Sequence, residues 1–253
     1  MKATTLVLLL ALTGCLFPEA QLEEAVVPDG LYLWLMADDG AIADESGLVS
    51  QWTDHSGSER HATQAFVALQ PTKQDAAMGN LPAIHFDGSE DELDLPEGFE
   101  QICDGFTFFA VVRPDASAAG TPRSMFYIGN GGETDDLAVM GLDGDYLVEL
   151  VDRQARIPEY LENTPAIVRV VMRTNAGTLG IAVNTGDEHQ EHDVVPASCT
   201  PRALNLIGRD DYGLVGRFSG LLAEILFYER ALEPTEVAEV TNYLNAKWSC
   251  CSP

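Results

Sequence analysis

Three acidic residues within one six-residue segment have the types and spacing that sugar hydrolysis uses. In Glu92-Leu-Asp-Leu-Pro-Glu97, the side chains of Glu92 and Asp94 would share one face of a strand, because side chains alternate along it. A bulge before Glu97 would turn that carboxylate to the same face, where two carboxylates can act as nucleophile and acid of a retaining glycosidase. Pro96 removes one ladder hydrogen bond, and so acidic a chain brings carboxylates close together by chance. Catalysis by Glu92, Asp94 and Glu97 is therefore an alternative and not the expected function.

Acidic residues in predicted turns are the candidate ligands for sugars and for calcium. We expect ligand binding by Asp143, Asp145, Asp211 and Tyr212, since carboxylates accept hydrogen bonds from sugar hydroxyls and aromatic rings stack on sugar faces. Oxygen-rich turns also suit calcium, with Asp143 and Asp145 as possible ligands, although no complete pattern such as an EF-hand loop is present. A solvated acidic rim explains the same residues, so no cofactor is required.

No other segment carries a catalytic or metal-binding pattern. The sequence has no Gly-x-Ser-x-Gly elbow, Walker loop, dinucleotide fingerprint or His-Glu-x-x-His motif. The one close histidine pair, His189 and His192, is explained by a solvated loop without a metal. We therefore expect a protein that is not an enzyme.

The charge balance excludes one class of partner. The chain has 253 residues, with 14 Lys and Arg against 40 Asp and Glu, which gives a formal net charge of −26. Such a surface repels phosphate backbones, so a nucleic-acid partner is excluded. The hydrophobic fraction of 46% is enough for a folded core, so the chain is not a disordered acidic tail.

The first fifteen residues are organised like a bacterial lipoprotein signal. Lys2 precedes a short apolar run, Leu6 to Leu12, which is too short to span a bilayer as a helix. The run ends in Leu-Thr-Gly-Cys15, which resembles the bacterial lipobox. The resemblance implies a signal peptide over residues 1–14 and lipidation of Cys15 by several acyl chains such as palmitate, which together anchor stably. Residues 15–29 are then the lipidated cysteine and a short acidic tether.

The residue after Cys15 indicates in which membrane the protein is anchored. Leu16 stands where inner-membrane lipoproteins of the enteric type carry Asp. By that resemblance the protein is anchored in the outer membrane, and both the periplasmic side and the cell surface remain open.

Four further cysteines remain in an exported chain, and their even number predicts disulfides. Cys103, Cys199, Cys250 and Cys251 allow two bridges in three pairings. A bridge between the adjacent Cys250 and Cys251 is strained and is the least favoured of these. No Cys-x-x-Cys spacing supports a metal site instead.

The body of the chain reads as strands and turns followed by one helix. Short β-prone runs, among them Phe106–Arg113 and Ala166–Thr174, alternate with Gly, Pro, Asn and Asp, and Asp143-Gly144 predicts a tight hairpin. Val237, Val240, Leu244 and Trp248 recur at helical spacing after Pro234, which favours a first helical turn. The pattern predicts an all-β sandwich of two antiparallel sheets with one C-terminal α-helix, in one domain.

Glu224 is the one acidic residue in an otherwise apolar predicted strand. A buried carboxylate must be paired or hydrogen-bonded, so we expect a structural role for it. By charge alone, Arg230 is the nearest candidate partner.

Segments from both ends of the body resemble one family. The segments are Leu33–Ala37, Val49–Gly57, Leu81–Gly88, Gly216–Leu232 and Tyr243–Trp248. They are similar to the laminin-G-like, concanavalin A-like lectin/glucanase domains of bacterial surface proteins. The resemblance implies a jelly-roll domain over residues 30–250, with a carbohydrate or protein ligand and sometimes calcium. Laminarinase-type glucanases of this superfamily carry a Glu-x-Asp-x-x-Glu pattern similar to the segment that begins at Glu92.

Taken together, these features predict a lipid-anchored, non-catalytic envelope protein for binding or adhesion, with carbohydrate as the expected ligand. One alternative is a structural envelope protein that binds another protein. The other is a retaining β-glucan hydrolase that uses Glu92 and Glu97.

Overall fold

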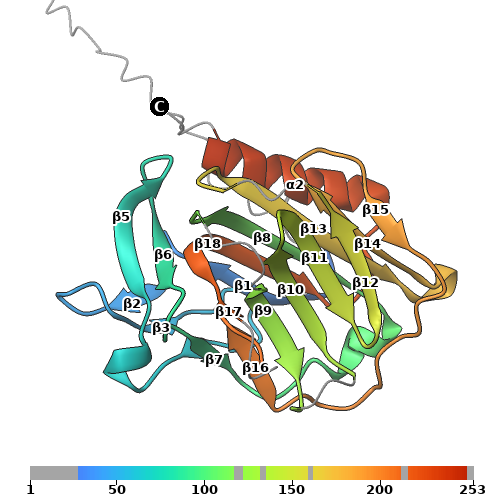
Figure 1. Cartoon of the computed structure of the whole chain (residues 1–253), viewed down its shortest axis with the longest axis horizontal. Coiled ribbons are helices and arrows are strands. Elements are labelled where there is room, and N and C mark those ends of the chain that lie inside the picture. Colours follow the sequence, from blue (N-terminus) through green and yellow to red (C-terminus); the bar gives the residue numbers. More distant parts are fainter. Residues whose placement is uncertain (1–27, 117–121, 132–134, 159–161, 212–215, 250–253) are drawn as a thin grey trace, which may run out of the picture.

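Two β-sheets packed face to face form the body of the protein in the computed structural model, which describes residues 28–116, 122–131, 135–158, 162–211 and 216–249 (Figure 1). Sheet A has eight strands in the order β15-β14-β13-β8-β18-β6-β5, with β1 also paired to β18. Sheet B has ten strands in the order β12-β11-β10-β9-β16-β7-β4-β3-β2, with β17 paired to β9. The described pairs are antiparallel apart from the short parallel pair of β17 with β9. The predicted all-β sandwich is confirmed.

The elements have the following bounds. Sheet A consists of β1 (Leu31–Met36), β5 (Thr72–Met78), β6 (Leu81–Asp87), β8 (Phe106–Pro114), β13 (Ala166–Arg173), β14 (Thr178–Val183), β15 (His189–Glu191) and β18 (Ser219–Tyr228). Sheet B consists of β2 (Ala41–Ala43), β3 (Val49–Trp52), β4 (Ala62–Thr63), β7 (Leu93–Leu95), β9 (Arg123–Gly129), β10 (Leu137–Leu142), β11 (Asp145–Leu150), β12 (Arg153–Ile157), β16 (Leu204–Ile207) and β17 (Gly216–Arg217). The helical elements are the 3-10 turns η1 (Val67–Leu69), η2 (Glu100–Asp104) and η3 (Thr174–Ala176), and helix α2 (Pro234–Ser249).

Aromatic rings from both sheets fill the space between them. The rings of Phe108 in β8 and Phe126 in β9 have centroids 4.8 Å apart, and Phe227 in β18 stacks on Phe126 at 6.0 Å. All three side chains are fully buried. Each such side chain contributes roughly 1.5–3 kcal/mol through the apolar area that it removes from water. This inner layer holds the two sheets together.

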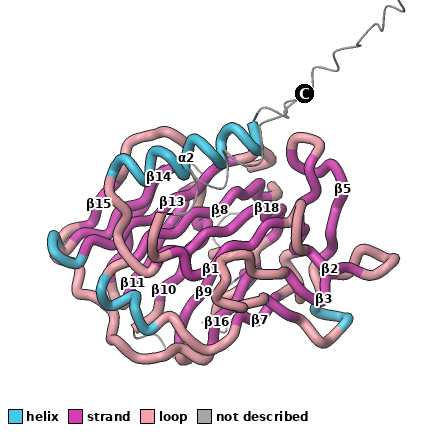
Figure 2. The backbone as a smooth tube through the Cα atoms, turned by 180° about the vertical axis from the view of Figure 1, so that it is seen from behind, coloured by secondary structure: helices cyan, strands magenta, loops and turns pink. Residues whose placement is uncertain are grey.

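Helix α2 covers the other face of sheet A (Figure 2). The four residues predicted from their spacing, Val237, Val240, Leu244 and Trp248, are all buried against that face. Because β18 is therefore covered on both sides, its inward residues Ile225 and Phe227 and its outward ones belong to two separate apolar clusters. Sheet B has no helix of the described chain packed on its outer face, so the two outer faces of the sandwich differ.

A fully buried carboxylate lies between α2 and sheet A. Glu224 Oε1 accepts hydrogen bonds from Trp34 Nε1 at 2.7 Å and from the Tyr243 hydroxyl at 3.0 Å. Its Oε2 accepts from Trp248 Nε1 and from Lys247 Nζ, both at 2.9 Å. Every donor except Trp34 comes from α2, so this one carboxylate ties the helix to the sheet.

The prediction that Glu224 is paired with a cation is confirmed, but the predicted partner, Arg230, is wrong. The salt bridge is made by Lys247, which also contacts Asp38 at 2.9 Å, while Arg230 pairs with Glu236 in the first turn of α2. Burial alone would lower the pKa of Lys247, but the two neighbouring carboxylates outweigh it and the pKa is raised. Lys247 is therefore charged inside the protein.

One disulfide is present among the described residues. Cys103 in η2 is joined to Cys199 in the segment before β16, across a sequence separation of 96. The two pairings that the sequence favoured would join Cys103 and Cys199 to Cys250 and Cys251, so that preference is wrong. Cys250 and Cys251 lie outside the described residues.

The predicted signal peptide, Cys15 and the tether up to residue 27 also lie outside the described residues. Within the part of the chain that the structure describes, no helix is long and apolar enough to cross a membrane.

Removing one charge of the Glu224–Lys247 pair should destabilise the fold strongly. Lys247→Met leaves the buried carboxylate without its cation, so the free energy of unfolding should fall by about 3–5 kcal/mol in urea denaturation. Glu224→Leu with Lys247→Met removes both charges and should recover part of that loss. Glu239→Gln, an exposed change on the same helix, should have little effect. A double variant as unstable as the sum of the two single variants would show that the two side chains do not act as a pair.

Candidate functional site

The outer face of sheet B is the candidate functional site, since α2 occupies the corresponding face of sheet A. On it, side chains from nine strands stand in one row, each directly opposite the next in the strand pairing. Their sequence neighbours point into the core, which places the row on the outside. In order, the row is Gln154, Glu149, Ala138, Tyr127, Leu206, Asp94, Thr63, Gln51 and Ile42.

This row is apolar in its middle and polar on both sides. Tyr127, Ala138 and Leu206 form a small buried cluster together with neighbouring residues of β10 and β11. Gln154 and Asp94, on either side of that cluster, are exposed. The Gln154 amide donates a hydrogen bond to the Glu149 carboxylate, so the polar group on β11 and β12 has a defined geometry. Planar amide and carboxylate groups fixed in this way suit hydrogen bonding to hydroxyl groups.

Two chain connections meet over this face. The Tyr127 hydroxyl donates to Asp136 Oδ2 at 2.7 Å, which ties the β9–β10 connection to the sheet. Burial raises the pKa of Asp136, although the Tyr127 hydrogen bond opposes the shift. In the β16–β17 connection, the Asp211 carboxylate lies beside Gly131, where an added Cβ would be 3.1 Å from it. Asp211, predicted as a ligand residue, therefore borders the candidate face, whereas Tyr212 lies outside the described residues.

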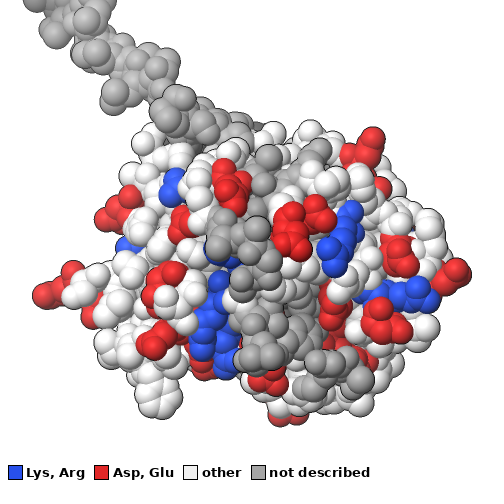
Figure 3. Space-filling view, in the orientation of Figure 1, with Lys and Arg blue, Asp and Glu red and all other residues white. Residues whose placement is uncertain are grey.

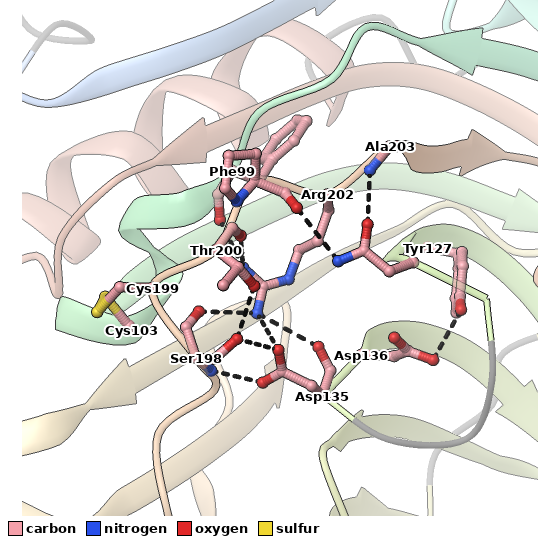
Figure 4. Close-up of polar contacts among 12 residues, drawn as sticks. Phe99, Cys103, Tyr127, Asp135, Asp136, Ser198, Cys199, Thr200, Arg202 and Ala203 are labelled. Atoms are coloured by element: carbon pink, nitrogen blue, oxygen red, sulfur yellow. Dashed lines mark hydrogen bonds and ion pairs between the residues drawn. A yellow bond between two sulfur atoms is a disulfide. The ribbon is translucent and has the colours of Figure 1, made fainter.

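A buried guanidinium holds the β9–β10 connection (Figure 4). Arg202 has no exposed surface, and burial lowers its pKa. It donates to the carbonyl oxygens of Phe99 at 3.2 Å, Thr200 at 2.7 Å and Ser198 at 3.0 Å, and to the Asp135 carboxylate at 3.1 Å. The Arg202 contacts join the β9–β10 connection to the segment before β16, where the disulfide is also attached. Because the partners are mostly backbone atoms, no sequence pattern predicted this group.

The predicted catalytic carboxylates occupy three different settings. Glu92, just before β7, is bound by Arg209 and, at 2.7 Å, by Arg217. Asp94 is exposed on the face beside it, and partial desolvation by its neighbours, together with the charge of Glu92, raises the pKa of its carboxyl. Glu97 lies beyond the end of β7 and is exposed, so the bulge expected to turn it onto the face is not formed. The structure thus brings Glu92 and Asp94 together and adds two arginines that the sequence did not predict.

The other predicted ligand residues lie at the β10–β11 hairpin. Asp143 and Gly144 both have positive φ, 53° and 89°, as the predicted tight turn requires. Asp145 lies 4.0 Å from Arg156 on the same face. In the described ranges, no group of three or more His, Cys, Asp and Glu side chains is placed to hold a metal ion. Calcium binding at Asp143 and Asp145 stays a prediction.

Acidic side chains are spread widely over the surface seen in Figure 3, while basic side chains gather in a few places among them. Arg209 and Arg217 share the Glu92 carboxylate. In a chain of net charge −26, two arginines on one carboxylate are a local exception.

Comparisons with known proteins bear on the fold. No protein-family model matches the chain, and no curated protein matches it. Among solved structures, domain 4 of the GH43 extracellular arabinanase AbnA from Geobacillus stearothermophilus, in complex with arabinotriose, is similar with a TM-score of 0.63. That match has 14% identity and covers 83% of this chain and 98% of the domain. Trypanosoma rangeli sialidase in complex with the inhibitor DANA is similar with a TM-score of 0.60 and 15% identity, over 87% of this chain and 33% of the sialidase.

These similarities establish a shared sandwich fold, and the chain spans only about a third of the sialidase. They also correct one expectation. Because the similar structures are those of sialidases and of an arabinanase, the expectation that this protein is not an enzyme is contradicted. That expectation depended on missing motifs, and the sandwich occurs within enzymes.

The stability of this region should depend on pH through Asp91, next to Glu92. Burial raises the pKa of the Asp91 carboxyl to about 6, so its contribution to stability is present below about pH 4 and is lost as the pH rises through 6. Asp91→Asn should therefore be more stable relative to the parent at pH 8 than at pH 4, by about 1–3 kcal/mol in urea denaturation. Asp75→Asn, at an exposed position of β5, is the control. An equal effect of Asp91→Asn at both pH values would contradict the shift.

Proposed function

We propose that this protein is a lipid-anchored envelope protein that binds carbohydrate on the outer face of sheet B. The observation that carries the proposal is the row across nine strands, with polar planar side chains on either side of an apolar middle. Tyr127, Ala138 and Leu206 in the middle have no exposed surface, so a sugar would contact the polar side chains of β11 and β12 on one side and Asp94 on the other. Sugar chains present hydroxyl groups along their length, and the Glu149, Gln154 and Asp94 side chains offer both donors and acceptors to them.

The structural neighbours support a carbohydrate ligand. The arabinanase domain was solved with arabinotriose, and the T. rangeli sialidase was also solved with sialic acid. Both share the sandwich with this chain at low identity, so the ligand is transferred only as part of the proposal. The concanavalin A-like group that the sequence resemblance implies is part of this proposal, and the two facing antiparallel sheets with a C-terminal helix support it.

Carbohydrate binding should be lost when the polar row is truncated. Glu149→Ala with Gln154→Ala, or Asp94→Ala alone, should weaken binding at least tenfold, about 1.4 kcal/mol, because the fixed hydrogen-bonding groups are removed. Binding is measured on an oligosaccharide array that includes arabinotriose, followed by calorimetry with the best sugar. Glu239→Gln, on the exposed side of α2, should bind like the parent.

Other outcomes of that experiment separate the remaining functions. Absence of binding to every sugar, with an envelope protein co-purifying in equal amount, would contradict the proposal in favour of a protein ligand. Release of reducing ends during the incubation, abolished in Glu92→Gln, would identify hydrolysis at Glu92.

The membrane anchor is a separate part of the proposal. Lipidation of Cys15 would hold the acidic domain close to the outer membrane, since anionic lipids do not attract it. Cys15→Ala should move the protein from the detergent phase to the aqueous phase in a detergent phase separation, and should abolish incorporation of labelled palmitate. A detergent-phase protein that retains the label in Cys15→Ala would contradict an anchor at this residue.

A further inference from the structure

Large exposed apolar side chains gather at one end of sheet B. Phe66, which is 70% exposed, and Val67 are adjacent just after β4, and Ile42 lies two strands away in β2. Together with the exposed alanine on either side, Phe66 and Val67 form an apolar tip, residues 65–68, at the edge of the molecule in Figure 2. Val195 is also exposed, but it follows β15, which lies on the opposite side of the molecule from β2 and β3 (Figure 1). Single exposed apolar residues are common on protein surfaces, whereas a group of them marks a contact site.

Hydrogen bonds hold the apolar tip in a fixed conformation. The Phe66 N–H donates to the Gln64 side chain at 3.0 Å, and the Phe66 carbonyl oxygen accepts from the Leu69 N–H at 2.9 Å. The Gln70 N–H donates to the Val67 carbonyl oxygen at 3.3 Å, and its side chain donates to the Gln64 carbonyl oxygen at 2.8 Å. Gln64 and Gln70 are buried, so the base of the tip is part of the folded sandwich. Backbone groups that already have partners can leave water at little cost.

The chemistry of the apolar tip favours an apolar phase over a sugar or an ion. Residues 65–68 are Ala-Phe-Val-Ala, whose side chains neither donate nor accept hydrogen bonds, and no residue from 62 to 72 is charged. A sugar site combines a ring with polar side chains, which the tip does not have. At the base of the tip, Asp94 lies opposite Thr63 in the strand pairing, so an anionic partner is repelled. The tip therefore suits an uncharged apolar phase.

The lipid anchor proposed at Cys15 brings one apolar phase within reach of the tip. Residues 16–27 connect this cysteine to the described domain, and a fully extended segment of that length spans roughly 40 Å. A domain of this size is roughly 45 Å across, so the tether lets almost any side of it turn towards the bilayer. A group confined so close to the membrane meets lipid at high effective concentration, and weak insertion is then sufficient. A second copy of the chain is a poorer partner, because both copies are strongly acidic.

We propose that the apolar tip inserts into the phospholipid bilayer that holds the anchor and thereby orients the domain on the membrane. This inference rests on the anchor of the proposed function but not on the carbohydrate site. Acyl chains at Cys15 hold the chain at the membrane without fixing how the domain faces it, because residues 16–27 lie between the lipid and the domain. Phe66 and Val67 supply a second contact, and they leave water when they enter the acyl boundary. Asp94, at the base of the tip, then lies close to the bilayer surface.

The test is fluorescence quenching of the intact lipidated protein in vesicles of phosphatidylcholine with brominated acyl chains. The indole added in Phe66→Trp should emit at shorter wavelength and lose about half of its intensity to the bromine, because insertion brings it to the acyl boundary. Val195→Trp, at an apolar position that is 65% exposed, should show neither change. Val67→Asp added to Phe66→Trp should abolish the quenching, since burying a carboxylate in the apolar phase is costly. Molar sodium chloride should not weaken the quenching, because no charge attraction is involved.

The outcomes separate the tip from the anchor and from the carbohydrate site. Incorporation of palmitate without quenching of Phe66→Trp would overturn insertion and leave the anchor in place. Quenching without palmitate would support insertion and contradict lipidation. Emission at shorter wavelength without quenching would show that the tip is buried against protein, which overturns the bilayer as its partner, and equal quenching of Val195→Trp would overturn a specific role of the tip. Failure of every sugar to bind would leave these results unaffected.

Discussion

The burial of a single carboxylate fixes the position in which helix α2 docks on sheet A. Glu224 has no access to water, and it is stable there only because two indoles, one phenol and one ammonium group donate to it. Three of these four donors come from α2, so the polar network and the apolar stripe of the helix require the same docked position. The helix therefore cannot slide along sheet A without leaving a charge unpaired in the interior.

That constraint gives the two outer faces different chemistry. The face of sheet A is sealed by α2, so side chains there are part of the core. The face of sheet B keeps a polar row, two arginines on Glu92 and two connections that meet above Tyr127. Arg202 binds Asp135 of the β9–β10 connection and several carbonyl oxygens, which fixes the backbone there. Rigid support of this kind preorganises a binding surface.

Patterns among neighbouring residues predicted much of this fold, but they did not predict contacts between residues far apart in the sequence. The Asp143-Gly144 turn and the stripe on α2 depend on neighbouring residues only, so both were predicted correctly. The partner of Glu224 was not, because Lys247 lies 23 residues away and reaches it only once the helix has docked. Arg217 is 125 residues from Glu92, and no spacing rule connects them. Of the site, the sequence identified the acidic residues but not the cations that hold them.

The position of β18 has a consequence for the order of folding. This strand pairs with β8 on one side and with β6 and β1 on the other, yet it is the last strand in the described part of the chain. Until residues 219–228 have been made, the edges of β6 and β8 have no partner between them, and exposed edges of this kind promote aggregation. Pairing across such long sequence separations is also slow. A chain that emerges from its amino end therefore cannot complete sheet A until β18 has been made, and it is more vulnerable to proteases and to self-association during that delay.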